Sequence, residues 1–95
     1  MEIFRKDGEE FTSIEANFNS NGDLTIDGQD MGPLVEEFWG DSDYEYFLTI
    51  PKSEMNDFIL VLIKKAFSKN GKLDFSDLIN ICKENEIKYH YDYWI

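Results

Sequence analysis

The sequence predicts an α+β fold in which an antiparallel sheet of about four to five strands is packed on one face by two helices. Alternating apolar and polar residues recur before Pro51, two segments with helical spacing follow it, and an alternating aromatic segment ends the chain. With 95 residues, folding buries roughly 60 to 65% of the unfolded chain's surface, enough for one core. We therefore expect a single domain over residues 1–95.

The first part of the chain reads as strands joined by tight turns. An Asp-Gly pair at positions 7–8 predicts a turn between a short strand over residues 2–5 and a longer one over 10–18. The polar segment 19–22 predicts a second turn. It leads into a strand over 23–27, in which apolar and polar residues alternate as one buried face requires.

The segment that follows is interrupted by turn residues. Gly28, Gly32 and Pro33 are expected to break the strand pattern. Residues 34–39 fit either a short turn of helix or part of a loop. Alternation resumes over residues 44–50 and predicts a central strand. One face of that strand would carry Tyr44, Tyr46, Leu48 and Ile50.

Two amphipathic helices are expected after Pro51. Ser53 is the expected N-cap of the first helix, whose apolar stripe would be Met55, Phe58, Ile59, Leu62 and Ala66. Gly71 suits the left-handed position that closes it. Asp74, with Asp77 three residues later, is the expected cap of the second helix. Its apolar face would be Phe75, Leu78, Ile79 and Cys82.

The last segment favours a strand. Residues 87–94 are rich in Tyr and Trp and alternate aromatic with polar side chains. Strands, then helices, then one strand fit an antiparallel sheet covered on one face. The sequence contains no repeat and no low-complexity tract.

Negative charge is concentrated in the first half of the chain. The net charge of −11 comes from 20 Asp and Glu against 9 Lys and Arg. No Lys or Arg lies between Lys6 and Lys52, whereas twelve carboxylates lie from Asp7 to Glu45. Such a surface repels nucleic acid and anionic lipid and attracts cationic partners. We expect a basic protein as partner, no nucleic acid and no membrane; alternatively, the acids only keep the surface soluble.

An acidic and aromatic segment is the candidate interface. Residues 36–46 interleave carboxylates with Phe, Trp and Tyr, and aromatic anchors ringed by charge suit protein interfaces. The alternative is that Phe38, Trp39 and Tyr46 belong to the core while the acids face water. Together with aspartates of the preceding hairpin, the expected partner-binding residues are Asp23, Asp27, Asp30, Glu36, Glu37, Trp39, Asp41, Asp43, Tyr44 and Glu45.

A calcium site is the first alternative function. Residues 19–30 place oxygen side chains at the ligand positions of an EF-hand loop. However, Leu24 stands where the sharp turn requires Gly, and Asp30 replaces the bidentate Glu. Turn chemistry explains the segment without a metal. We therefore expect no metal and no cofactor, with calcium binding through Asp23, Asp27 and Asp30 as the alternative.

The signals for catalysis are incomplete. His90 is the only histidine, so neither a catalytic triad nor a site with several histidines can be assembled. Carboxylate pairs within residues 36–45 are expected by chance in so acidic a chain, which leaves a small enzyme as a second alternative. Cys82 is the only cysteine and fits a core position in a reducing compartment. From these incomplete signals we expect a protein that is not an enzyme. With no signal peptide and no long apolar run, we expect it to be cytoplasmic.

The segments GDLTIDGQDMG (residues 22–32) and FWGDSDYEYFLTI (residues 38–50) resemble small acidic bacterial proteins. These proteins are immunity partners of polymorphic toxins, including those of contact-dependent growth inhibition. The resemblance covers roughly residues 11–95 and implies binding to a nuclease-like toxin domain, with acidic side chains imitating phosphates. Immunity proteins differ in fold and often bind away from the toxin's active site, so no contact residue is transferred. The sequence leaves open whether the chain is a monomer or a homodimer.

Overall fold

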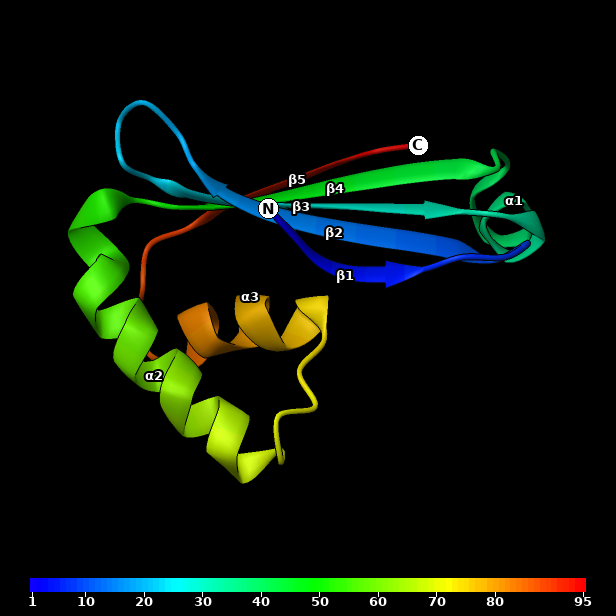
Figure 1. The fold of residues 1–95 in the computed structure, drawn as a ribbon. Coiled ribbons are helices and arrows are strands. Elements are labelled where there is room, and N and C mark those ends of the chain that lie inside the picture. Colours follow the sequence, from blue (N-terminus) through cyan, green and yellow to red (C-terminus); the bar gives the residue numbers. More distant parts are fainter.

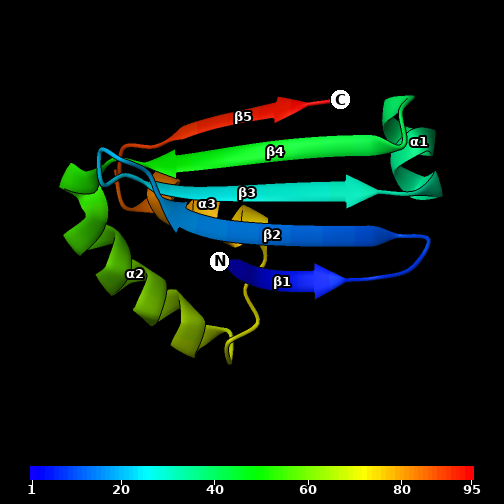
Figure 2. The same cartoon turned by 45° about the horizontal axis from the view of Figure 1, so that its top comes forward.

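The computed structural model describes residues 1–95 and contains one five-stranded antiparallel sheet whose strands are neighbours in chain order. The strands are β1 (Glu2–Lys6), β2 (Phe11–Phe18), β3 (Leu24–Met31), β4 (Asp43–Ile50) and β5 (His90–Trp94). The helices are α1 (Pro33–Trp39), the short 3-10 helix η1 (Lys52–Glu54), α2 (Met55–Ser68) and α3 (Phe75–Glu84). Helices α2 and α3 lie on one face of the sheet and α1 lies at one end, while the other face carries no helix (Figures 1 and 2). The predicted α+β class is confirmed.

Strand β3 continues past the point where the sequence predicts its end. Gly28 lies inside the strand and pairs with Tyr46 of β4. The ring of Tyr46 lies over Gly28 so closely that a Cβ atom built there would be 1.9 Å from Tyr46 Cε2. A neighbouring aromatic ring thus fills the space that a side chain would occupy. The expected break falls at Gly32 and Pro33, where β3 gives way to α1.

The core lies toward the end of the sheet where β3 begins and β4 ends. It consists of Ile26, Leu48, Ile50, Phe58, Ile81, Cys82 and Ile87. Ile26 and Leu48 are register partners, and the alternation predicted for residues 44–50 points Leu48 and Ile50 inward as expected. Only 10 of the 95 residues are buried. Much apolar surface elsewhere on the helix-covered face of the sheet therefore stays accessible.

Helix α2 begins and packs differently from the prediction. Ser53 lies in η1, and the N-cap position of α2 is Glu54, which makes no side-chain cap hydrogen bond. The predicted apolar stripe is also partly wrong, because Ile59 is 46% exposed whereas Phe58 is 1% exposed. Since α2 is inclined away from the sheet (Figure 1), only part of its apolar surface reaches the core, and Val61 contributes there instead.

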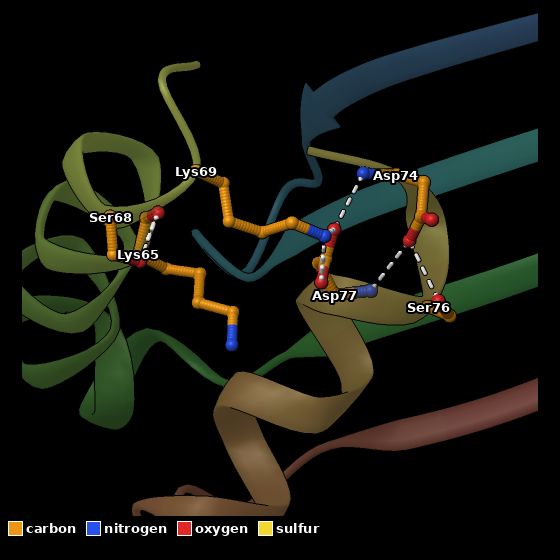
Figure 3. A network of polar contacts seen from close by, with 6 residues as sticks. All are labelled: Lys65, Ser68, Lys69, Asp74, Ser76 and Asp77. Carbon is orange, nitrogen blue, oxygen red and sulfur yellow. Dashed lines mark hydrogen bonds and ion pairs between the residues drawn. The ribbon is translucent and has the colours of Figure 1, made fainter. Parts of the chain in front are cut away.

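Helix α3 begins at the predicted cap. Asp74 Oδ1 accepts a hydrogen bond from the backbone N–H of Asp77, and Asp77 Oδ2 accepts one from the N–H of Asp74, both at 2.9 Å. Lys69, just after α2, donates to both carboxylate oxygens of Asp77 at 2.8 and 3.0 Å (Figure 3). This ion pair lowers the pKa of Asp77. The segment joining α2 to α3, in which Gly71 has the expected left-handed φ of 77°, is thereby tied to both helices.

Candidate functional site

The face of the sheet that carries no helix is rich in carboxylates. The antiparallel register places Glu15 directly opposite Asp27, Asp27 opposite Phe47, and Phe47 opposite Asp92. Alternate residues of a strand share a face, so Asp43 and Glu45 of β4 lie on the same face as Phe47. We call this surface the acidic sheet face and define it by five residues: Glu15, Asp27, Asp43, Glu45 and Asp92.

A shallow depression of about 170 Å³ lies within this face. It is lined by Ser13, Glu15, Asp27, Gly28, Gln29, Glu45 and Phe47, so three of its seven residues are carboxylates and none is a cation. Arg5 is the only Lys or Arg among the strand residues of this face, and it pairs with Glu2 and Asp7 at 3.0 Å each. The charge of the depression is therefore not balanced within the chain.

Two of these carboxylates repel each other. Burial raises the pKa of Asp27, and the charge of Glu15 raises it further. Like charges directly opposite one another destabilise a sheet. Neutralising either acid would remove this repulsion. The pair therefore does not stabilise the fold.

Asp27→Asn is expected to increase the free energy of unfolding at pH 7 by about 0.5 kcal/mol. A carboxyl whose pKa is raised by folding destabilises the folded state once pH exceeds the ordinary value, here 3.8. The gain should therefore disappear at about pH 3, where the carboxyl is protonated in both states. Urea unfolding at the two pH values measures this. An equal gain at both would show that repulsion is not its cause.

The opposite face of the sheet contains an apolar cleft. It has a volume of about 1010 Å³ and opens between the sheet, α3 and the segment that joins α2 to α3. Of the 22 residues that line it, 17 are hydrophobic. Its only charged residues are Asp30 and Asp74, and no Lys, Arg or His lines it. The cleft is therefore both apolar and negatively charged.

Polar side chains meet on the sheet side of this apolar cleft. Asp30 Oδ1 accepts hydrogen bonds from Thr12 Oγ1 at 2.8 Å and from the Tyr46 hydroxyl at 3.1 Å. The hydroxyls of Tyr44 and Tyr91 lie 3.4 Å apart. Burial and the charge of Asp30 raise the pKa of Tyr46 above its ordinary value. Tyr46 therefore remains a neutral donor to Asp30 at physiological pH.

Aromatic rings form one end of the apolar cleft. The ring centroids of Tyr46 and Phe75 are 4.6 Å apart in an edge-to-face arrangement, and those of Trp39 and Tyr44 are 5.0 Å apart in the same arrangement. Tyr91 lies 6.2 Å from Phe75 and so joins β5 to this group. All five rings line the cleft: Trp39, Tyr44, Tyr46, Phe75 and Tyr91.

The ten residues predicted to bind a partner lie in four places. Those on the acidic sheet face are Asp27, Asp43 and Glu45. Those lining the apolar cleft are Asp30, Trp39 and Tyr44. Those exposed on α1 and the turn after it are Glu36, Glu37 and Asp41. The remaining one is Asp23, at the far end of the sheet, which accepts a hydrogen bond from the backbone N–H of Lys52 at 2.8 Å.

The segment proposed as a calcium loop has a different structure. Residues 24–31 form β3, and Asp27 and Asp30 project from opposite faces of it. No three His, Cys, Asp or Glu side chains lie close enough together to hold a metal ion. The geometry of an EF-hand loop is therefore not present at residues 19–30.

Sequence reasoning missed two members of the acidic sheet face. Glu15 stands between Ile14 and Ala16, and Asp92 between Tyr91 and Tyr93. Strict alternation in the predicted strands already places both opposite the apolar side. Their proximity to Asp27 depends on the strand order and register, which the sequence does not specify.

Comparison with protein-family models, with curated proteins and with solved structures gives no match to this chain. None of its helices has the length and apolar character needed to cross a membrane. Function must therefore be inferred from the acidic sheet face and the apolar cleft themselves.

Proposed function

We propose that this protein is a non-catalytic binding protein whose acidic sheet face docks on a basic surface of another protein. One observation supports this most strongly: a depression on an uncovered sheet face is rimmed by Glu15, Asp27 and Glu45 and contains no cation. A Lys or Arg side chain of a partner that enters the depression would lie among carboxylates and meet no cation of this chain. Its charge also relieves the repulsion between Glu15 and Asp27.

The same face offers apolar contacts beside the charges. Phe47 lines the depression, and Trp94, the register partner of Glu45, is 66% exposed. Large aromatic side chains next to charged groups are typical of the residues that contribute most to protein interfaces. Charge then increases the rate of encounter, while the aromatic side chains slow dissociation.

The partner class that we propose is a nuclease-like toxin domain. It rests on the resemblance of residues 22–32 and 38–50 to immunity proteins of polymorphic toxins. A nuclease needs a cationic groove for the phosphates of its substrate, and carboxylates spaced along neighbouring strands can occupy such a groove in their place. We place this role in the cytoplasm, where the single buried thiol of Cys82 needs no disulfide partner.

Affinity capture from a bacterial lysate tests the proposal. The tagged protein is used as bait at about 50 mM and about 500 mM salt, and captured proteins are identified by mass spectrometry. We expect one basic protein in stoichiometric amount at low salt and much less at high salt, and we expect the purified protein to inhibit that partner's nuclease activity. Capture of an acidic partner, or of none at either salt concentration, would contradict the proposal.

A further inference from the structure

The apolar cleft has the dimensions of a small-molecule site. Clefts that bind such ligands have volumes of roughly 300 to 1000 Å³, mostly apolar walls and a few convergent polar groups. At about 1010 Å³ with 17 hydrophobic residues among 22, this cleft lies at the upper end of that range. Its walls come from the sheet and from all three α-helices, so a ligand would contact every layer of the fold.

One carboxylate oxygen in the cleft is free to accept a hydrogen bond. Thr12 and Tyr46 both donate to Asp30 Oδ1, and no group of the chain donates to Oδ2. Since no fully buried side-chain oxygen of the chain lacks a hydrogen-bond partner, Asp30 Oδ2 is not fully buried, and Asp30 is one of the residues that line the cleft. The two donors to Oδ1 hold the carboxylate in place and leave Oδ2 for a ligand.

The charge and the aromatic rings favour a cation. No Lys, Arg or His lines the cleft, so the charge of Asp30 has no counterion there. Tyr44 is the register partner of Asp30 and lines the cleft beside this carboxylate, and Tyr46 is hydrogen-bonded to it. Aromatic faces attract cations within about 6 Å, more strongly where water is excluded. An anionic ligand would meet only repulsion.

The wall opposite the sheet is held in place. Asp74 and Phe75 line the cleft and belong to the first turn of α3. The ion pair between Lys69 and Asp77, together with the reciprocal cap between Asp74 and Asp77, fixes this turn against the end of α2 (Figure 3). A wall already ordered before binding reduces the entropy that binding loses.

We propose that the apolar cleft binds a small organic cation, with the ammonium group of the ligand against Asp30 Oδ2 and its apolar body along the hydrophobic walls. This site is on the face opposite the acidic sheet face and does not depend on the proposed docking of a protein there. The ligand class is an amine that carries an aliphatic or aromatic group.

Calorimetric titration with three probes of one shape tests this inference. Phenylhexylamine, phenylhexanol and phenylhexanoate share an apolar body and differ in charge. We expect the amine to bind with one-to-one stoichiometry and at least about tenfold more tightly than the alcohol, because both can donate a hydrogen bond to Asp30 but only the ammonium group carries a positive charge that the carboxylate and the aromatic rings attract. The carboxylate probe should show no binding.

Two substitutions on β3 form a matched pair. Asp30→Asn keeps an oxygen that accepts from Thr12 and Tyr46 but removes the charge, so it should reduce the preference for the amine over the alcohol to less than about twofold. Unchanged affinity for the alcohol shows that the cleft itself is intact. Asp27→Asn removes the same charge on the opposite face of the same strand and should leave both affinities unchanged.

Three results would overturn the inference. Absence of binding by every probe would show that the cleft is not a ligand site. Equal affinity of wild-type protein for the amine and the alcohol would show that Asp30 does not select a cation. An equal loss of amine affinity in Asp27→Asn and Asp30→Asn would show that the amine responds only to the overall negative charge.

Discussion

Gly28→Ala is expected to lower the free energy of unfolding by about 3 kcal/mol, at the upper end of the usual effect of overpacking. A Cβ atom at this position would lie 1.9 Å from Tyr46 Cε2 and 2.2 Å from Cζ. The ring cannot move away easily, because Tyr46 is 8% exposed, its hydroxyl donates to Asp30, and its ring centroid lies 4.6 Å from that of Phe75. Thermal unfolding should show a fall in Tm of about 15 °C.

Two controls separate the clash with Tyr46 from other effects of adding a methyl group. Gly40→Ala adds the same group where no atom lies within 4 Å, and it should cost only the left-handed backbone strain, about 1 kcal/mol. In a Tyr46→Ala background, Gly28→Ala should cost less than about 0.5 kcal/mol. A full loss of stability in that background would show that the ring is not what excludes a side chain from position 28.

Neutralising the depression on the acidic sheet face is expected to slow association with a basic partner about 100-fold at low salt. The variant combines Glu15→Gln, Asp27→Asn and Glu45→Gln, the three carboxylates of the depression. Stopped-flow or surface-binding kinetics at about 50 and about 500 mM salt measure the effect, which should shrink at the higher concentration. Stability should not fall, because the substitutions remove repulsion.

A second triple variant with the same change in net charge is the control. It combines Glu36→Gln, Glu37→Gln and Asp41→Asn, which are exposed on α1 and the turn after it. We expect its association rate to change less than about threefold. If both triple variants slow association equally, the net charge of the protein rather than the acidic sheet face directs binding.

Local signals predicted most of the fold. Alternation located the strands, and Asp74 with Asp77 located the start of α3, because both patterns depend on residues close in sequence. The prediction that Gly28 ends a strand is wrong, because this glycine makes room for the ring of Tyr46. Tyr46 belongs to a strand that follows much later in the chain, so no local pattern shows this role. Ser53 fits an N-cap by residue type, yet the 3-10 helix after Pro51 moves the start of α2 beyond it.

The candidate site was less accessible to sequence reasoning. The charge distribution showed that carboxylates such as Asp27 and Glu45 lie in a part of the sequence without Lys or Arg, but it did not assign them to a face. Asp27 and Asp30 are three residues apart, and their separation onto opposite faces follows only once the strand is known to continue through Gly28. The apolar cleft depends on how far the helices extend over the sheet, which no local pattern determines.

Carboxyl-group footprinting of the complex would test most directly whether the acidic sheet face binds the partner. Free and partner-bound protein are labelled with a carbodiimide and an amine, and the modification of each Asp and Glu is measured by mass spectrometry. We predict strong protection of Glu15, Asp27 and Glu45 in the complex and unchanged labelling of Glu36 and Glu37. Protection of Glu36 and Glu37 with unchanged labelling of the other three would contradict the docking surface proposed for this protein.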